Sequence, residues 1–132
     1  RRRSFLILYI VMNKAFIIGR LVRDPDFRLT PSGVQLCRFT IAVDRIPKQE
    51  NQTADFIRVV TWRRLAEICN QYLKKGKLVA VDGRLQIDSY EKDGEKRYSS
   101  EIVADGMQML DRGNDGVQQN VSSDTAPNFD LV

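Results

Sequence analysis

The sequence predicts an all-β fold with one helix, arranged as a five-stranded barrel in a single domain. Three observations favour this class. Apolar residues alternate as in strands in five segments, one segment has a helical period, and single glycines interrupt the strands where a curved sheet must bend. A chain of 132 residues is long enough for one such domain and a tail, and too short for two full cores.

Two strands are predicted at the start of the domain. Met12–Asp24 is rich in β-branched and apolar residues around Gly19, which is typical of a long strand that bends at a bulge. Pro25 and then residues 30–33 supply turn residues, after which Val34–Asp44 resumes as a strand. One face of that strand is apolar and is predicted to line the core: Cys37, Phe39, Ile41 and Val43. Residues 45–54 are polar and are expected to form an exposed loop.

The third predicted strand, Asp55–Trp62, carries bulky residues on both faces. One row consists of Ile57, Val59 and Thr61. The other row consists of Phe56, Arg58, Val60 and Trp62. Two large aromatic rings are not typical of a solvated face, so this row is expected either to bind a ligand or to complete a core or a subunit interface.

A helix is predicted after the third strand. Arg64–Lys75 has a helical period, and Gly76 after two lysines is typical of a C-terminal cap. The apolar stripe is spaced at i, i+3, i+4, i+7 and i+8: Leu65, Ile68, Cys69, Tyr72 and Leu73.

Two strands are predicted after the helix. Lys77–Tyr90 returns to strand alternation, with a bend expected at Gly83. Asp93 and Gly94 predict a hairpin turn, and a last strand runs from about residue 97 to residue 110. Three strands, a helix and two strands are the element order of a five-stranded OB-fold barrel.

The domain is predicted to span residues 12–112. Residues 1–11 have a basic start and a short apolar run like a signal peptide, but no small-residue cleavage site follows, and the run is shorter than the ~18 residues that a spanning helix needs. We interpret them as an added or mis-started extension ahead of Met12, with a genuine apolar arm as the alternative. Residues 113–132 lack an apolar period and are predicted to be a disordered tail.

The charge is unevenly distributed. Residues 1–3 supply three of the 21 basic residues, and residues 113–132 supply three of the 17 acidic residues and no basic one, which leaves 18 basic and 14 acidic residues between them. A basic body favours a polyanionic partner, although a net charge of this size is common in other proteins. The chain has no histidine, which removes the usual general base and the usual zinc ligand.

The two cysteines suggest no metal or disulfide framework. Cys37 and Cys69 lie 32 positions apart without a CxxC pair, and each belongs to an apolar row of its own predicted element. Both are therefore expected to be small buried residues in a reducing compartment, and no metal ligand or cofactor is predicted.

Four stretches carry a resemblance to a known family. They read NKAFIIGRLVRDPDFRLTPSG, DFIRVVTWRRLAEICNQYLKKG, VDGRLQIDSY and YSSEIVADGMQMLDR. Together they resemble bacterial single-stranded DNA-binding proteins over residues 12–112. The resemblance implies a homotetramer of OB-folds that binds single-stranded DNA in replication, recombination and repair. It also implies a protein without catalysis, in the cytoplasm and associated with the nucleoid.

The resemblance assigns DNA-contacting positions. Phe56 and Trp62 match base-stacking positions in the third strand, and Tyr90 matches another near the end of the fourth. Basic positions match at Arg58, Arg64, Lys14, Arg28, Lys74, Lys75 and Arg97. The physical argument agrees, because every base has a π-face and a ring beside an arginine can hold it regardless of sequence. The alternatives are buried or interface rings and ordinary solvated charges.

Two stretches depart from the family pattern. A further stacking position falls near Ile46 and Pro47, where this chain has no ring. Basic residues are common in the family where this chain has Gln86, Ile87 and Asp88, so the DNA path or its strength is expected to differ there.

The tail also departs from the family, whose acidic C-terminus closes with Pro-Phe and docks replication and repair proteins. Here the chain ends in APNFDLV. Partner docking through Phe129, Asp130 and Leu131 is one interpretation, and a disordered end without partners is the other.

Two further functions remain open from the sequence. An OB-fold module of this kind could instead bind RNA. Alternatively, the exposed rings could contact a protein partner in an interaction module that binds no nucleic acid.

Overall fold

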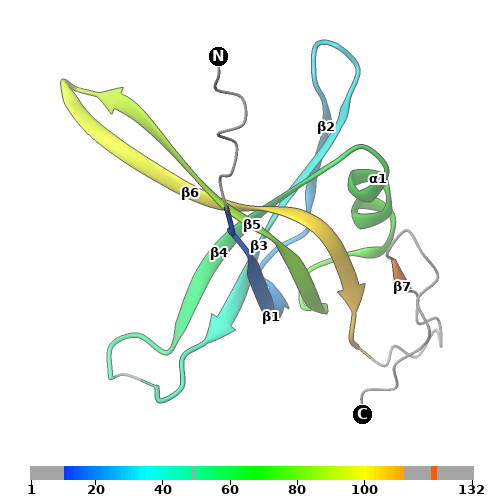
Figure 1. The fold of residues 1–132 in the computed structure, drawn as a ribbon. Coiled ribbons are helices and arrows are strands. Elements are labelled where there is room, and N and C mark those ends of the chain that lie inside the picture. The colour runs from blue at the N-terminus through cyan, green and yellow to red at the C-terminus, as the bar shows by residue number, and fades with distance from the viewer. Residues whose placement is uncertain (1–10, 49, 112–119, 122–132) are drawn as a thin grey trace.

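The computed structural model describes residues 11–48, 50–111 and 120–121 (Figure 1). Its elements in chain order are β1 (Ala15–Leu21), β2 (Asp26–Leu29), β3 (Gln35–Asp44), β4 (Ala54–Trp62), α1 (Arg63–Tyr72), β5 (Leu78–Lys92), β6 (Glu95–Met109) and β7 (Asn120–Val121). The predicted domain limits at 12 and 112 and the predicted disorder of 113–132 stay predictions. Of that last segment only residues 120–121 are described, and β7 pairs with β6.

Five strands form a closed ring. The sheet runs in the order β1-β5-β6-β4-β3, and a second pairing of β1 with β3 joins its two ends. The β4–β6 pair is parallel and the other pairs in the ring are antiparallel. The predicted fold class is confirmed as mostly β with one helix between β4 and β5, in a ring consistent with an OB-fold.

The inner faces of the ring make the core. Cys37 and Ile41 of β3 are fully buried, as their sequence pattern predicted, and so are Val59 and Thr61 of β4; each has 0% of its surface exposed. The helix α1 contributes Ala66, Cys69 and the adjoining Leu73 to the same cluster. Burial raises the pKa of the Cys37 thiol to about 11 and that of Cys69 to about 12, so both thiols stay protonated at neutral pH.

Two glycines allow the ring to close. A side chain at Gly19 would overlap the carbonyl oxygen of Ala42, and one at Gly83 would overlap the carbonyl oxygen of Val103. The register of β5 with β6 shifts between Asp82 and Gly83, which confirms the predicted bend there. Backbones therefore approach each other at these points closely enough that only glycine fits.

The helix ends earlier than its sequence predicted. It stops at Tyr72, and Leu73 is extended with φ −91° and ψ 148°. The next backbone groups bond to the region of β1: Lys75 N–H donates to Asp24 Oδ1 at 2.9 Å, and Gly76 N–H donates to the Leu21 oxygen at 2.9 Å. Gly76, with φ 90°, thus lies in a turn that docks on β1 and does not cap the helix directly.

No strand was predicted between Pro25 and the turn residues 30–33, where the structure has β2. Asp26–Leu29 pairs with the start of β3, with Phe27 opposite Cys37. This short strand adds a hairpin outside the ring. The predicted turn at Asp93 and Gly94 is confirmed, with φ of 55° and 79°.

Two hairpins project from the ring toward the same side of the molecule. Figure 1 shows the end of the β3–β4 hairpin at lower left and that of the β5–β6 hairpin at upper left. They diverge from the β4–β6 pairing, which is limited to the partners of Val59 and Val60. These hairpins carry half of the predicted DNA-contacting residues: Phe56, Arg58, Trp62, Tyr90 and Arg97.

The close approach at Gly19 gives a test of ring closure. Gly19→Ala should lower the free energy of unfolding by about 1–3 kcal/mol, because the new methyl group overlaps backbone of β3. Urea denaturation followed by circular dichroism measures this. Gly94→Asn is the control, because its surroundings are open and asparagine tolerates a positive φ. Equal stabilities of the two variants would contradict the role given to Gly19.

Candidate nucleic-acid interface

The outer face of β4 presents two aromatic rings and an arginine. Phe56 is 68% exposed, Trp62 is 40% exposed and Arg58 is also exposed. The residues that alternate with them, Val59 and Thr61, are completely buried. A strand whose inner face is core and whose outer face carries exposed rings can offer those rings to a ligand without disturbing the fold.

Phe56 and Trp62 have different surroundings on β4. Phe56 lies opposite Ala42 of β3, whose small side chain leaves the ring uncovered. Trp62 is the last residue of β4 and lies opposite Leu36. Arg63, with φ 60°, turns the chain from the strand directly into α1. The indole is therefore held where the rigid strand meets the rigid helix.

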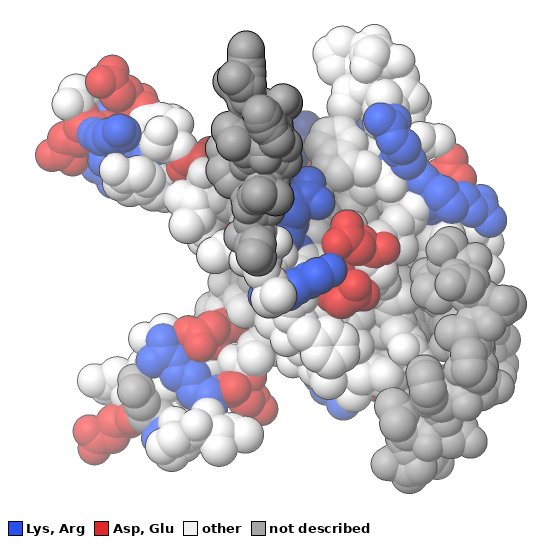
Figure 2. All heavy atoms as spheres, in the orientation of Figure 1, with Lys and Arg blue, Asp and Glu red and all other residues white. Residues whose placement is uncertain are grey.

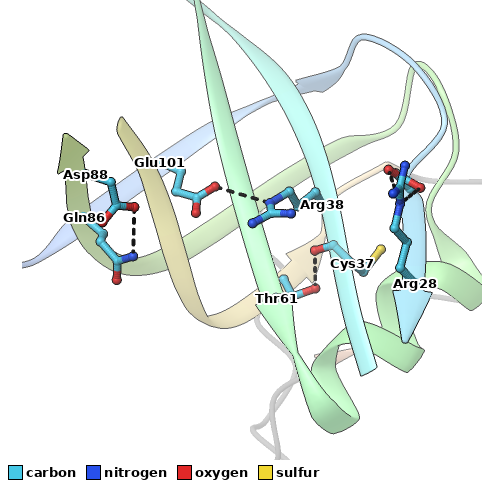
Figure 3. Close-up of polar contacts among 8 residues, drawn as sticks. Arg28, Cys37, Arg38, Thr61, Gln86, Asp88 and Glu101 are labelled. Atoms are coloured by element: carbon cyan, nitrogen blue, oxygen red, sulfur yellow. Dashed lines mark hydrogen bonds and ion pairs between the residues drawn. The ribbon is translucent and has the colours of Figure 1, made fainter. Parts of the chain in front are cut away.

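Between the two rings, an ion pair crosses the strand. Arg38 of β3 pairs with Glu101 of β6 at 3.5 Å, reaching over β4 as Figure 3 shows. Val60, which pairs with Val103 and lies opposite Arg38, is only 1% exposed. Along β4 the outer row thus consists of the exposed Phe56 and Arg58, the covered Val60 and the exposed Trp62.

Arg28 extends this face onto β2. The register places Arg28 opposite Leu36, which is in turn opposite Trp62, so all three share one side of the sheet. The Arg28 guanidinium pairs with Asp26 at 3.1 Å (Figure 3). Arg64 follows Trp62 by two positions in α1 and pairs with Glu67 at 3.4 Å. Both arginines are exposed, so solvent screens these pairs.

Tyr90 and Arg97 lie on the other hairpin. They are directly opposite each other in β5 and β6, and Tyr90 is 48% exposed. Arg97 also pairs with Glu95 at 3.3 Å. Figure 2 shows basic and acidic side chains mixed on both projecting hairpins, with a hollow between them. Asp88, in the stretch where the DNA path or its strength was predicted to differ, accepts a hydrogen bond from Gln86 at 3.4 Å (Figure 3).

Three lysines of the predicted site lie outside β4. Lys74 and Lys75 are exposed in the turn after α1, beside Asp24. Lys14 is exposed just ahead of β1. Its neighbour Asn13 exchanges two hydrogen bonds with the backbone of Leu85, at 2.8 and 3.0 Å, and so fixes this segment near the base of the β5–β6 hairpin.

The loop between β3 and β4 is closed at its base. Arg45 and Asp55 form an ion pair of 2.7 Å, and the hydrogen bond from Arg45 lowers the pKa of Asp55. Ile46 lies near the position where the resemblance implied a further stacking ring, and it is 94% exposed. The loop therefore presents an aliphatic side chain there.

The described part of the chain contains no group of three or more acidic or cysteine side chains placed to hold a metal ion. Its one helix, α1, has ten residues and cannot span a membrane.

Comparison with known proteins identifies the family of this chain. Residues 12–110 match the single-strand binding protein family. The chain belongs to the single-strand binding protein family. It is 45% identical over 120 residues to the single-stranded DNA-binding protein of Bacillus cereus, covering 89% of this chain and 71% of that one. It is 50% identical over 105 residues to the single-stranded DNA-binding protein of Thermotoga maritima, covering 76% of this chain and 74% of that one.

Membership of the single-strand binding protein family confirms the resemblance seen in the sequence and the predicted class, a binding protein and not an enzyme. The roles of individual residues stay predictions. Phe129, Asp130 and Leu131 lie outside the described residues.

The sequence interpretation missed two basic residues of this surface. Arg38 shares the outer face of β3 with Thr40, and strand alternation around Cys37 and Phe39 could have indicated it. Arg23 follows β1 and was included in the predicted first strand, so only the fold reveals that it lies near Arg58.

Proposed function

We propose that this chain binds single-stranded DNA without sequence preference, by stacking bases on exposed rings and neutralising phosphates with nearby arginines. The supporting observation is the row on β4, where Phe56, Arg58 and Trp62 are exposed while Val59 and Thr61, which alternate with them, are buried. Stacking tolerates any base, because each base has a π-face. The names of the relatives in Bacillus cereus and Thermotoga maritima agree with this function.

Two groups of contacts follow from the geometry. The first is the β4 face with Arg28 and Arg64 at its end. The second is the pair of Tyr90 and Arg97 on the β5–β6 hairpin. A strand bound to both would cross the hollow between the hairpins in Figure 2. Lys14, Lys74 and Lys75 would then contact DNA only where it leaves these faces.

The wider biological role is part of the same proposal. Protection of exposed single strands serves replication, recombination and repair in the bacterial cytoplasm, where free thiols such as Cys37 and Cys69 persist. An RNA ligand would use the same stacking surface, and competition between DNA and RNA oligomers of matched sequence distinguishes the two. A protein-interaction module would bind neither.

Trp62 gives the direct test, since it is the only tryptophan in the chain. Oligothymidylate should quench its fluorescence. Trp62→Ala should weaken binding about 5- to 150-fold, because a stacked base contributes ~1–3 kcal/mol. Trp62→Phe should retain most of the affinity.

Thermal melting provides the control for that substitution. The Ala variant should melt close to the wild type, because the indole projects from the outer face of β4. Unchanged affinity in Trp62→Ala, or no quenching in the wild type, would contradict the stacking role.

We also propose a homotetramer. The outer side of β1 exposes two large apolar residues, Phe16 at 71% and Ile18 at 47%. Exposed apolar side chains grouped on one strand are typical of a surface that packs against another chain.

Light scattering at micromolar concentration should give about four times 15.2 kDa. Phe16→Lys should lower this mass, since a charge would be buried at the contact. Ile46→Lys should not, because Ile46 lies in the loop after β3. A wild-type monomer would contradict the proposal.

The C-terminal tail is proposed to dock replication and repair proteins through Phe129, Asp130 and Leu131. Truncation after residue 121 keeps β7 and removes these residues. Binding to oligothymidylate should be unchanged or slightly tighter, because acidic groups that compete with phosphate are lost. Pull-downs with the full chain should capture such proteins and pull-downs with the truncated chain should not. Equal capture by both chains would contradict docking through these residues.

A further inference from the structure

A pocket lies on the outer face of the sheet, beside the row formed by Phe56, Arg58 and Trp62. Its volume is about 290 Å³, and the loop after β1 contributes to its wall together with β2, β3 and β4. We call it the arginine pocket, lined by Arg23, Asp24, Asp26, Arg38, Phe39, Thr40 and Arg58. Arg58 belongs both to this pocket and to the proposed stacking row.

The carboxylates of the arginine pocket are already engaged. Asp24 accepts the Lys75 N–H at 2.9 Å, and Asp26 pairs with Arg28 at 3.1 Å. Arg38 is likewise held by Glu101 at 3.5 Å. Each of these contacts satisfies a lining group with a partner that comes from outside the pocket.

The other two arginines, Arg23 and Arg58, differ from Arg38 in this respect. Neither Arg23 nor Arg58 forms an ion pair with any residue within the described ranges. Both residues line the same pocket, and the carboxylates that share it, Asp24 and Asp26, are bonded to Lys75 N–H and Arg28. Planar guanidinium groups have the donor geometry that phosphate oxygens accept, which makes an anion the ligand that fits this pocket.

The position of the pocket points to the same ligand. Phe56 and Trp62 are six residues apart on β4, which corresponds to ~20 Å along a strand. Arg58 lies between them, opposite Thr40. DNA stacked on both rings must carry its backbone past this point.

We propose that the arginine pocket binds one backbone phosphate of the DNA strand between the bases stacked on Phe56 and Trp62, with Arg23 and Arg58 as its ligands. This inference rests on the proposed function. It assigns DNA contact to Arg23, and it gives Arg38, held by Glu101, the task of shaping one wall. The competing possibility is a base edge, whose amino group would bind Asp24 or Asp26.

The test uses the full chain and three variants. Arg23→Gln removes one proposed phosphate ligand. Asp26→Asn removes a lining carboxylate. Lys96→Gln is the matched control, because it removes one positive charge from the opposite face of the β5–β6 hairpin, where Lys96 lies 5.9 Å from the Tyr98 ring centre. Affinities for oligothymidylate and oligodeoxycytidylate of equal length are measured over a range of salt, and thermal melting verifies the fold.

Arg23→Gln should weaken binding of both oligomers about fivefold at 0.1 M salt and lower the slope of log K against log salt by ~0.7, the value for one phosphate on a single strand. Quenching of Trp62 at saturation should persist. Asp26→Asn should bind both oligomers as tightly as the wild type or more tightly, and Lys96→Gln should keep the wild-type slope.

Other outcomes overturn the proposal in distinguishable ways. If the wild type binds and Arg23→Gln behaves like Lys96→Gln, the pocket holds no phosphate while the proposed function stands. If Asp26→Asn loses affinity for oligodeoxycytidylate alone, the pocket reads a base edge. If the wild type binds neither oligomer, the proposed function fails and the pocket fails with it.

Discussion

Gly19 lies where β1 pairs with two strands at once. Its register partner in β5 is Val79, and its Cα comes so close to the carbonyl of Ala42 in β3 that no side chain fits between them. Because β1 can approach both neighbours, the sheet closes into a ring and its inner faces meet in one core. The helix α1 then packs against that core through Ala66 and Cys69. Without the β1–β3 pairing, β1 and the second half of β3 would be open edges.

Ring closure also separates the two faces of each strand. On β4 the inner residues are buried, and the Thr61 hydroxyl donates a hydrogen bond of 2.9 Å to the carbonyl of Cys37, so the polar group in this row is satisfied (Figure 3). The outer residues then contribute little to the core and are free to carry rings and charge. This division lets Phe56 and Trp62 be exposed on a strand that remains rigid.

The parts predictable from the sequence are those whose pattern is local. Alternation predicted the buried row from Cys37 to Ile41 and the two-faced β4, and Asp93 with Gly94 predicted the hairpin turn. The strand β2 was missed because Asp26–Leu29 is short and becomes a strand only through pairing with β3. The helix end was misplaced for a similar reason, since the bond from Lys75 to Asp24 joins residues that are distant in sequence.

Ion pairs on the surface explain why the net charge of the chain is a poor guide to how strongly this surface would attract phosphate. Arg28, Arg64 and Arg97 each pair with an acidic neighbour within three positions in sequence. These pairs are exposed, and such pairs are worth only about 0–1 kcal/mol, so a phosphate can replace the carboxylate at little cost. The free energy gained from the phosphate is also reduced, because each arginine exchanges a carboxylate for a phosphate. Arg23 and Arg58 form no such pair within the described ranges, so in the proposed binding mode a phosphate would displace no carboxylate from them. In that binding mode the electrostatic part of the affinity depends on Arg23 and Arg58 more than on the total excess of basic residues.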